Sequence, residues 1–402
     1  MNKMTLADVN FQGKKALVRV DFNVPQNKDG SPSDTTRIKE AIPTISYIID
    51  HGGSVVLMSH LGRPAGKKNP AFSLSPCAKA LSSLLNKEVL FVEDCKGPQV
   101  EAAVQNLKAG EILLLENLRF YEAEENPKID PSFAKSLAAL GDVYVNDAFG
   151  TAHRKHSSTA VIAQYFPDRA VEGLLMQKEI SFLSSLLENP KRPFFAILGG
   201  AKVSSKIGVL KSLVSKVDAF FIGGAMTYTF MKAKGLSIGD SLCEIDYLTT
   251  AREFIDLCQA NHIPLHLATD IVIASRFHSD AETTIQSADE AIPGHWQGVD
   301  IGPKTIALWS AALQNAGTIF WNGPLGVFEF DKFAKGTRAI AKMIATLPCN
   351  TIVGGGDSVA AIHQLGLSQE FSHISTGGGA SLEYLEFGHL PGIDALSTKK
   401  NL

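Results

Sequence analysis

Short apolar runs recur along the chain, and each of them ends at a turn or a polar cluster. In the first half these runs lie in KALVRVDFNVP (15–25), SVVLMSHLGRP (54–64), EILLLENLRF (111–120) and DVYVNDAFG (142–150). In the second half they lie in FFAILGG (194–200), AFFIGG (219–224), PLHLATDIVIA (264–274), TIFWNGPLG (318–326) and NTIVGGGDS (350–358). Segments of helical length separate the runs. Strands that alternate with helices predict parallel sheets with helices on both faces.

The middle of the chain indicates how the sheets are divided. With 402 residues the chain is too long for one ordinary core, so we expect two domains. Between prolines at 167 and 193, apolar residues recur at roughly helical spacing at Leu175, Ile180, Leu183 and Leu187. A helix over 171–188 that joins two domains and acts as a hinge fits this pattern, and an ordinary surface helix fits it equally well. The predicted fold class is α/β, with two doubly wound, Rossmann-like parallel-sheet domains joined by a hinge helix.

Composition narrows the classes of ligand. A net charge of -3 argues against bulk electrostatic binding to nucleic acid or to an anionic membrane, so an anion site requires a local cluster of positive charge. The five cysteines form no C-x-x-C, which favours a reducing compartment over a disulfide framework or a metal clip. No signal-peptide core and no run of eighteen apolar residues occurs. We therefore expect a cytoplasmic protein with no membrane or nucleic-acid partner.

The residues that follow the strands differ between the two halves. First-half strands run into polar and basic residues: Asp21 and Asn23, His60 and Arg63, Arg119, and Asp147 with Arg154 shortly after. Second-half strands run into glycines at 199–200, 223–224, 323 and 354–356. Arginine forks suit a small, multiply charged anion, whereas glycines let backbone N–H groups approach a polyphosphate. Because ligands of such sheets bind beyond the carboxyl ends of the strands, we expect two sites for two different anions.

Each of these features also has a simpler interpretation. A single exposed arginine is usually a solvated charge, and Asp21 and Asn23 can be turn residues before Pro25. The pair His153 and His156 has H-x-x-H spacing, but nothing nearby supplies the other ligands of a zinc site. We expect a polar, anion-facing loop there.

Two lysines and one aspartate give the second half its chemistry. Lys202 and Lys206 are four residues apart, which predicts that they share one face of a helix that starts there. Asp357 follows three glycines at a predicted helix start, where it can be a simple cap. Beside phosphates, however, it would repel the ligand unless a cation lay between them, which indicates Mg²⁺. The run is not G-x-G-x-x-G, so a dinucleotide site gains little support.

Taken together, the motifs resemble the phosphoglycerate kinase family over essentially the whole chain. Seven segments occur in family order: VRVDFNVP (18–25), SHLGRP (59–64), ENLRF (116–120), NDAFGTAHRKHSS (146–158), GGAKVSSKI (199–207), WNGPLGVFE (321–329) and GGGDSVAA (354–361). The resemblance implies a monomeric kinase that moves a phosphoryl group between 1,3-bisphosphoglycerate and ADP, giving 3-phosphoglycerate and ATP. It implies a 3-phosphoglycerate domain over 1–170, the hinge helix over 171–188, a nucleotide domain over 189–380, and a tail over 381–402 that returns to the first domain.

The resemblance also assigns residues to the two ligands. The glycerate would be held by Asp21, Phe22, Asn23, Arg37, His60, Leu61, Gly62, Arg63, Arg119 and Arg154. The magnesium nucleotide would be held by Lys202, Lys206, Gly224, Gly298, Asn322, Glu329, Gly355, Gly356, Asp357 and Ser358, with Asp357 as the metal ligand. Arg37, Lys202 and Lys206 would be catalytic. The sequence departs from the family pattern at Ala65, at Ser205 and, in the tail, at Phe387 and Gly388; the tail positions concern local contacts and not the reaction.

The chemistry agrees with the residues. A carboxylate acceptor with a pKa of about 4 is already ionised at neutral pH and needs no general base. Transfer then depends on positioning and on neutralising charge at the moving group. Two other classes share parts of the pattern: a hinged anion-binding protein, which would be expected to carry an export signal, and a Rossmann dehydrogenase, which needs the missing dinucleotide fingerprint.

Overall fold

The structure, a computed structural model, describes residues 2–399 and divides into two compact units. Unit 1 contains the chain up to Ser181 together with the segment from His389 onward, and unit 2 contains Phe182–Gly388. The division falls inside helix α6, Leu174–Glu188, so the chain passes between the units within this helix. Within the described part of the chain, no helix is both long and apolar enough to cross a membrane.

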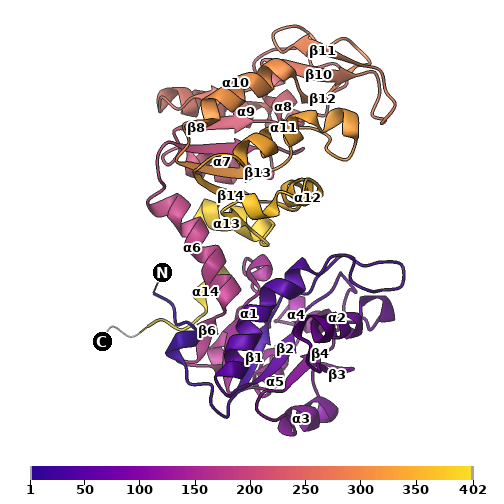
Figure 1. Cartoon of the computed structure of the whole chain (residues 1–402), viewed down its shortest axis with the longest axis vertical. Helices are drawn as coiled ribbons and strands as arrows, with labels where there is room; N and C mark the ends of the chain where they lie inside the picture. The colour runs from indigo at the N-terminus through magenta and orange to yellow at the C-terminus, as the bar shows by residue number, and fades with distance from the viewer. Residues whose placement is uncertain (1, 400–402) are drawn as a thin grey trace. The chain divides into compact units, whose positions relative to one another are not determined.

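Unit 1 is built on one parallel sheet of six strands in the order β3-β4-β2-β1-β5-β6. The strands are β1 Lys15–Arg19, β2 Ser54–Met58, β3 Leu90–Val92, β4 Ile112–Leu115, β5 Val143–Asn146 and β6 Ala170–Glu172. The helices are α1 Thr36–Asp50, α2 Ser75–Leu85, α3 Pro98–Gln105, α4 Glu122–Glu125, α5 Ser132–Ala138 and, in the C-terminal segment, α14 Pro391–Asp394 (Figure 1). Five short 3-10 turns complete the unit: Leu6–Asp8, Pro70–Phe72, Leu118–Phe120, Phe149–Thr151 and Val161–Tyr165.

Both faces of this sheet are buried, as expected of parallel strands. Successive residues of β1 belong to different cores: Ala16 and Val18 pack with α1 and α2, whereas Leu17 packs with α3 and α5. This two-residue alternation means that the continuous apolar runs of the sequence serve two cores at once.

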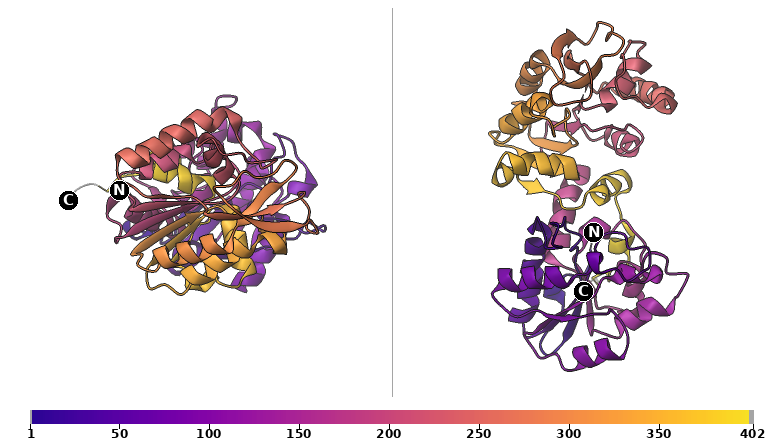
Figure 2. Two further views of the ribbon diagram at one scale, coloured as in Figure 1. Left: turned by 90° about the horizontal axis from the view of Figure 1, so that it is seen from above. Right: turned by 90° about the vertical axis from the view of Figure 1, so that its right-hand side faces the viewer.

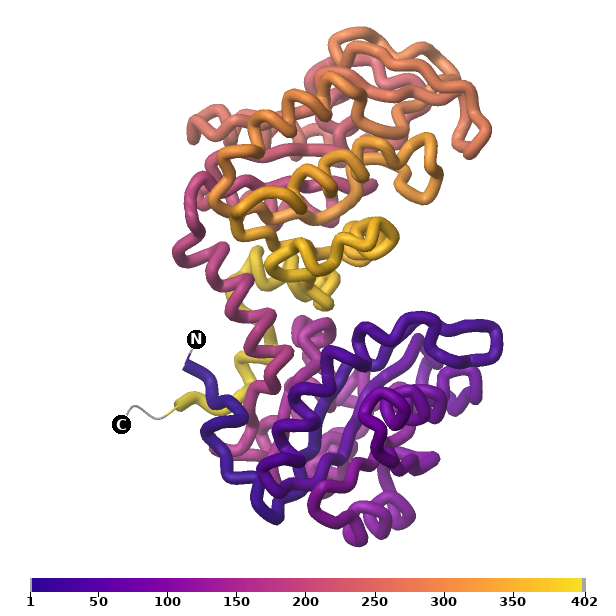
Figure 3. Tube along the Cα trace, in the orientation of Figure 1, coloured from indigo at the N-terminus to yellow at the C-terminus, as the bar shows by residue number. Residues whose placement is uncertain are grey.

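The two ends of the described chain lie side by side in unit 1, where the C-terminal segment follows the N-terminal one in Figure 3. The backbone N–H of Met4 donates to the carbonyl of Ser397 at 2.8 Å, and Lys3 Nζ donates to the carbonyl of Leu396 at 2.8 Å. The last turn of chain is thereby fixed to the first domain.

Unit 2 contains a second parallel sheet of six strands in the order β15-β14-β13-β7-β8-β9. Its strands are β7 Phe194–Leu198, β8 Ala219–Ile222, β9 Leu265–His266, β13 Thr318–Asn322, β14 Asn350–Gly354 and β15 His373–Ile374. Its helices are α7 Ile207–Leu213, α8 Met226–Ala233, α9 Leu248–Ala260, α10 Pro303–Leu313, α11 Lys335–Ile344, α12 Gly356–Gln364 and α13 Gly379–Phe387. Three 3-10 turns lie at Ile245–Tyr247, Asp331–Phe333 and Ser368–Glu370.

Helices cover both faces of this second sheet. Helices α10, α11 and α12 pack in one core with Ile319, Trp321 and Val353, and on the other face Phe220 packs against Phe254 of α9 at a ring distance of 5.4 Å. Figure 2 (left) shows the strands between two helical layers. The two units therefore have the α/β, doubly wound architecture that the sequence predicts.

Three details of the elements differ from the expectation. Residues 170–172 form the edge strand β6 through pairing with β5, so the connecting helix begins at Leu174 rather than at 171. The run at 264–274 is two strands, because β10 Asp270–Ala274 leaves the main sheet for a separate antiparallel sheet with β11 Thr283–Ser287 and β12 Gln297–Ile301. Helix α13 packs on α7, where Ser212 Oγ donates to the carbonyl of Leu385 at 2.9 Å, so the tail leaves unit 2 at His389 rather than at 381.

Candidate active site

The polar residues of unit 1 gather at one edge of its sheet. Strands β4, β2, β1 and β5 are consecutive neighbours and all parallel, so the loops that follow their carboxyl ends meet at the same edge. These loops carry Asp21, His60, Arg119 and Arg154. The strand order reverses direction at β1, and such a switch point is where ligands of open α/β sheets bind.

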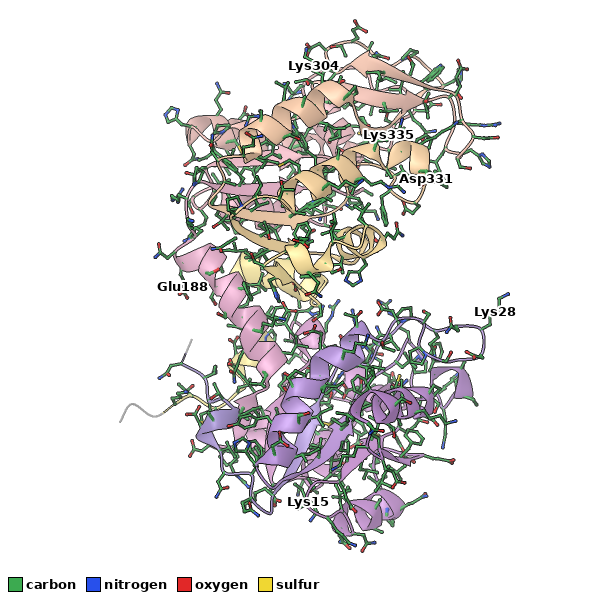
Figure 4. All side chains as sticks on the ribbon, in the orientation of Figure 1. Lys15, Lys28, Glu188, Lys304, Asp331 and Lys335 are labelled. Carbon is green, nitrogen blue, oxygen red and sulfur yellow. The ribbon has the colours of Figure 1, made fainter. Side chains whose placement is uncertain are left out.

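The loop after β1 alternates between buried and open side chains. Phe22 and Val24 are buried, whereas Asp21 and Asn23 are half-buried and face out of the core. Arg37 Nη1 donates to Asp21 Oδ2 at 2.8 Å and to the carbonyl of Asn23 at 3.3 Å. The guanidinium of Arg37 is therefore fixed beside the two polar residues. Lys28, farther along this loop, is exposed and points into solvent (Figure 4).

Gly62 links the loops that follow three strands. Its N–H donates to Asn23 Oδ1 at 2.8 Å, and its carbonyl accepts from Arg119 Nη1 at 2.9 Å. It has a φ of +62°, and a Cβ atom there would lie 2.4 Å from the Phe72 ring, so no other residue fits. Arg119 is held from the other side by Glu125, whose Oε1 lies 3.2 Å from Nη2.

Two residues of the predicted substrate set, Phe22 and Leu61, are apolar and pack inward. The side chains of Phe22 and Leu61 are buried in the hydrophobic core of unit 1. Their backbone N–H groups are already used, Phe22 donating to Ser59 Oγ and Leu61 to Asn117 Oδ1. These two residues therefore shape the loops, and the polar members of the predicted set are the ones that face out of the core.

Positive charge dominates this edge of unit 1. Arg63 and Arg154 are exposed, and no side-chain hydrogen bond or ion pair within residues 2–399 engages either guanidinium. Burial and neighbouring arginines lower the pKa of His153 to about 4 and that of His156 to about 3. Protonation of these rings is opposed first by burial and then by the neighbouring arginines. The cluster of arginines at this edge is what an anion site requires.

Glycines form the corresponding edge of unit 2. The neighbouring strands β14, β13, β7 and β8 are followed directly by Gly355, Gly323, Gly199 and Gly223. The loops after β7 and β13 touch through their backbones: Gly200 N–H donates to the carbonyl of Pro324 at 2.9 Å. A Cβ atom on Gly199 would lie 2.2 Å from that carbonyl oxygen, so side chains would force the loops apart. Backbone groups consequently line the switch point between β13 and β7.

Two adjoining pockets open at this edge. One of about 360 Å³ is lined by Lys202, Lys206, Asn322, Gly355, Gly356, Asp357 and Ser358, among others. A second of about 400 Å³ is lined by Gly224, Gly298, Glu329 and Asp357 together with apolar residues. Gly200, Ala201, Pro324 and Asp357 belong to both walls, so the two form one elongated site. The structure thus brings the whole predicted nucleotide set together.

The two lysines differ from the expectation and from each other. Helix α7 begins at Ile207, so Lys202 and Lys206 lie in the preceding turn and not on a helix face. The Nζ atom of Lys206 is buried and donates to the side-chain and backbone oxygens of Asn322, and burial lowers its pKa to about 8. Lys202 is exposed on the pocket wall. One lysine is fixed, and the other is free to follow a ligand.

The start of α12 offers a single carboxylate to a metal. Asp357 lies in the first turn of the helix, exposed on the walls of both pockets. Residues 2–399 contain no group of three or more metal-ligating side chains. A lone carboxylate beside a phosphate-sized pocket fits Mg²⁺, which uses few protein ligands together with phosphate oxygens. Ser358 is buried, and its hydroxyl accepts from Gly323 N–H, which fixes α12 to the loop after β13.

Some lining residues were missed from the sequence. Gly378 and Gly379 line the first pocket, and the glycine triplet at 377–379, which leads into α13 after β15, is a usable signal in the sequence. Leu242 and Phe277 line the second pocket with most of their side chains exposed. Both residues lie outside the main sheet, and the pattern of apolar and polar residues around them does not predict that they line a pocket.

Comparisons with known proteins point to one family. The model of the family described as phosphoglycerate kinase matches residues 6–388. A phosphoglycerate kinase of Moorella thermoacetica is 52% identical over 99% of this chain and 100% of its own length, and a cytosolic phosphoglycerate kinase of Nicotiana tabacum is 52% identical over 98% and 97%. The solved phosphoglycerate kinase of Coxiella burnetii is 40% identical with a TM-score of 0.87, and that of Pyrococcus horikoshii is 33% identical with a TM-score of 0.85, each over 98% of both chains.

Proposed function

This chain belongs to the phosphoglycerate kinase family, and on that premise we propose how its residues divide the work of the reaction. The enzyme is a glycolytic kinase that reversibly transfers a phosphoryl group from 1,3-bisphosphoglycerate to ADP, giving 3-phosphoglycerate and ATP. The proposal assigns the two substrates to the two units, and it gives a role to each charged residue at the two sheet edges.

The arginine-lined edge of unit 1 is assigned to the glycerate. The observation that carries this assignment is a pair of exposed guanidinium groups, Arg63 and Arg154, that no side-chain hydrogen bond or ion pair within residues 2–399 engages. Arg154 also acts on His153 and His156, whose protonation is suppressed. Arg63, Arg119 and Arg154 bind the phosphate and carboxylate with charge-assisted hydrogen bonds. Asp21 and Asn23 accept from and donate to the hydroxyl group, and Arg37 lies beside them at the carboxyl end of the substrate.

The glycine-lined pockets of unit 2 are assigned to ATP or ADP. The phosphates lie in the first pocket against the backbone of Gly355 and Gly356, with Lys206 and Asn322 behind them. The nucleoside lies in the second pocket, where Glu329 accepts from the ribose hydroxyls and Gly224 and Gly298 allow close approach to the backbone. Asp357 would hold Mg²⁺ at the boundary between the two pockets. When bound, the ion neutralises charge on the phosphate oxygens.

No proton has to be removed in this reaction. The attacking group is a carboxylate, which is ionised at neutral pH. The protein's part is to hold the reacting atoms in line, to exclude water and to place positive charge where negative charge develops. We assign these tasks to Arg37 from unit 1 and to Lys202 and Lys206 from unit 2. Lys202 is the group that can move with the phosphoryl group, because its side chain has no partner within residues 2–399.

We further propose that the enzyme acts as a monomer in the cytoplasm. All five cysteines are free, which fits a reducing compartment, and the tobacco relative is described as cytosolic.

A coupled assay tests the proposed substrates. Incubation with 3-phosphoglycerate, ATP and Mg²⁺ is expected to yield the acyl phosphate, which a consuming enzyme reports as turnover. Omission of Mg²⁺ should abolish the signal, and Asp357→Asn should require more Mg²⁺ for half-maximal rate. Turnover without any divalent cation would contradict the assignment of Asp357, and absence of turnover with these substrates would contradict the proposal as a whole.

A further inference from the structure

A fully buried arginine lies beneath the anion site of unit 1. Arg19 ends β1, two residues before Asp21, and its side chain has no exposed surface. Its Nε donates to Ser158 Oγ at 2.8 Å, and its Nη1 donates to the carbonyl of Val20. Its Nη2 lies 3.2 Å from His60 Nδ1. A buried guanidinium is costly unless its donors are used, and here each nitrogen has a partner.

The acidic end of this network fixes the direction of its hydrogen bonds. Ser158 donates its backbone N–H to Glu124 Oε2 at 3.0 Å and its hydroxyl to Glu124 Oε1 at 2.5 Å. Because the hydroxyl has only one hydrogen, its oxygen accepts from Arg19 Nε. Glu124 is itself fully buried, 3.9 Å from the guanidinium. The order from acceptor to donor is therefore Glu124, Ser158 and Arg19.

The same reasoning shows which ring nitrogen of His60, at the other end of the network, carries the proton. A guanidinium can only donate, so His60 Nδ1 must accept from Arg19 and carries no proton. In a neutral ring the proton is then on Nε2. No hydrogen bond within residues 2–399 engages Nε2, and this atom is not fully enclosed although the ring is buried, so it can donate to a ligand at this edge of unit 1.

We propose that Arg19 is a positioning residue that keeps His60 neutral in the Nε2–H tautomer, so that the ring presents one fixed N–H donor to the bound anion. Burial is the largest influence on the pKa of His60, and the charged groups that act on it most strongly also oppose its protonation. Arg19, Arg119, Arg37 and His156 surround it, and burial together with their charge lowers its pKa well below the usual value. The histidine adds a directional donor to the arginine cluster without adding a further buried charge.

The identity of the anion rests on the proposed function, but the tautomer does not. On that function, Nε2–H donates to an oxygen of 3-phosphoglycerate. Loss of the fixed donor is expected to raise the KM for 3-phosphoglycerate about tenfold, the effect of one hydrogen bond to a charged group.

Nitrogen NMR of the full-length protein, labelled with ¹⁵N in its histidines, tests the proposal without substrate. The His60 signals are identified by their loss in His60→Gln. We expect a pyridine-like Nδ1 and a protonated, pyrrole-like Nε2, unchanged from pH 8 to pH 5. A protonated Nδ1, or an imidazolium at neutral pH, would overturn the proposal.

Variants then test whether Arg19 is the cause. In Arg19→Met, His60 should sample both tautomers and titrate closer to the ordinary pKa of about 6.5. Arg169→Met is the matched control, because Arg169 is exposed in the same unit and bonds the carbonyl of Asp142. If the single variant fails to fold, Arg19→Met/Glu124→Gln removes both buried charges. An unchanged His60 spectrum in Arg19→Met, or in the double variant, would show that Arg19 does not set the tautomer. The spectrum of the control Arg169→Met should stay unchanged. Normal signals in a protein that lacks turnover would contradict the proposed function alone.

Discussion

Lys202 and Lys206 illustrate how two residues of one type reach different roles through burial. Asn322 holds the ammonium group of Lys206 in place, whereas that of Lys202 is exposed on the wall of the same pocket. Their spacing suggests equivalence on a helix face, which is wrong because α7 starts only at Ile207. The difference supports a binding role for Lys206 and a transition-state role for Lys202.

Lys202→Ala should therefore lower kcat far more than it raises the KM for ATP. An interaction that strengthens only as charge develops on the moving phosphoryl group contributes to kcat, by about a hundredfold for a strong electrostatic contact. Steady-state kinetics against ATP measure the split, with Lys211→Ala on the exposed side of α7 as the control. A loss confined to KM would mean that Lys202 binds only the ground state.

Arg63→Ala and Arg119→Ala should weaken the binding of 3-phosphoglycerate and leave the affinity for the nucleotide unchanged. Both guanidinium groups belong to unit 1, and charge-assisted hydrogen bonds of this kind contribute about 1.5–3 kcal/mol. We expect the Kd for 3-phosphoglycerate to rise by at least about tenfold in calorimetry. An equal loss of ATP affinity would contradict the assignment of the two anions to two units.

Asp147 connects the loop after β5 to helix α6 and should make stability depend on pH. Its Oδ1 accepts from the N–H groups of Leu175 at 2.9 Å and Met176 at 3.2 Å, and burial raises its pKa to about 7. Because the folded pKa exceeds the unfolded one, the folded state holds the proton between about pH 4 and 7 and loses stability as pH rises through this window.

Asp147→Asn keeps the acceptor and removes the ionisation. The free energy of unfolding of the variant, relative to that of the wild type, should increase by on the order of 1 kcal/mol per pH unit from about pH 4 to 7. Above that window the difference should stay constant. Chemical denaturation across this range measures the effect, with exposed Asp50→Asn as the control. A difference in unfolding free energy between variant and wild type that does not change with pH would contradict the account.

At the scale of elements, the regular parts of the sheets were predictable because their apolar runs are complete. Residues 170–172 were missed as a strand because the run is short and directly precedes a helix. The antiparallel sheet was missed because β11 is mostly exposed and therefore shows no apolar face. The positions of the loops at the strand ends follow from topology, whereas the tie between Arg19 and His60 depends on tertiary packing that spacing does not encode.

The loop that carries Lys202 is held by a segment outside the main sheet. Glu244 Oε2 accepts from Ser204 N–H at 3.0 Å, Glu244 Oε1 accepts from its hydroxyl at 2.5 Å, and Glu244 N–H donates to Thr229 of α8 at 3.1 Å. The neighbouring Leu242 lines the second pocket. Through these hydrogen bonds, Glu244 connects the loop that carries Lys202 to the wall of the second pocket, which we assign to the nucleoside.

Glu244→Ala should release the loop and lower kcat by about tenfold, since two hydrogen bonds to a carboxylate are lost. Glu253→Ala, an exposed glutamate on α9, is the control for a general loss of charge. Hydrogen exchange of residues 201–206 should increase in the first variant and not in the second. Unchanged kcat together with faster exchange would show that the order of this loop does not limit the reaction.

At the scale of the molecule, our proposal assigns the two substrates to different compact units, yet the reaction requires contact between the substrates. The reacting atoms must approach to about 3–3.5 Å in line. Our account therefore requires the two units to move together when both substrates are bound, with the ends of α6 absorbing the rotation. The sequence indicates the two units and their connecting helix, but the response to ligands is a property of the bound states.

Small-angle X-ray scattering of the apo protein, of each binary complex and of the ternary complex tests this central claim most directly. Magnesium ADP with 3-phosphoglycerate forms a ternary complex that cannot react, so the state persists during measurement. We predict that the radius of gyration decreases in the ternary complex by more than in either binary complex. A radius of gyration that is unchanged within error on forming the ternary complex would contradict the account.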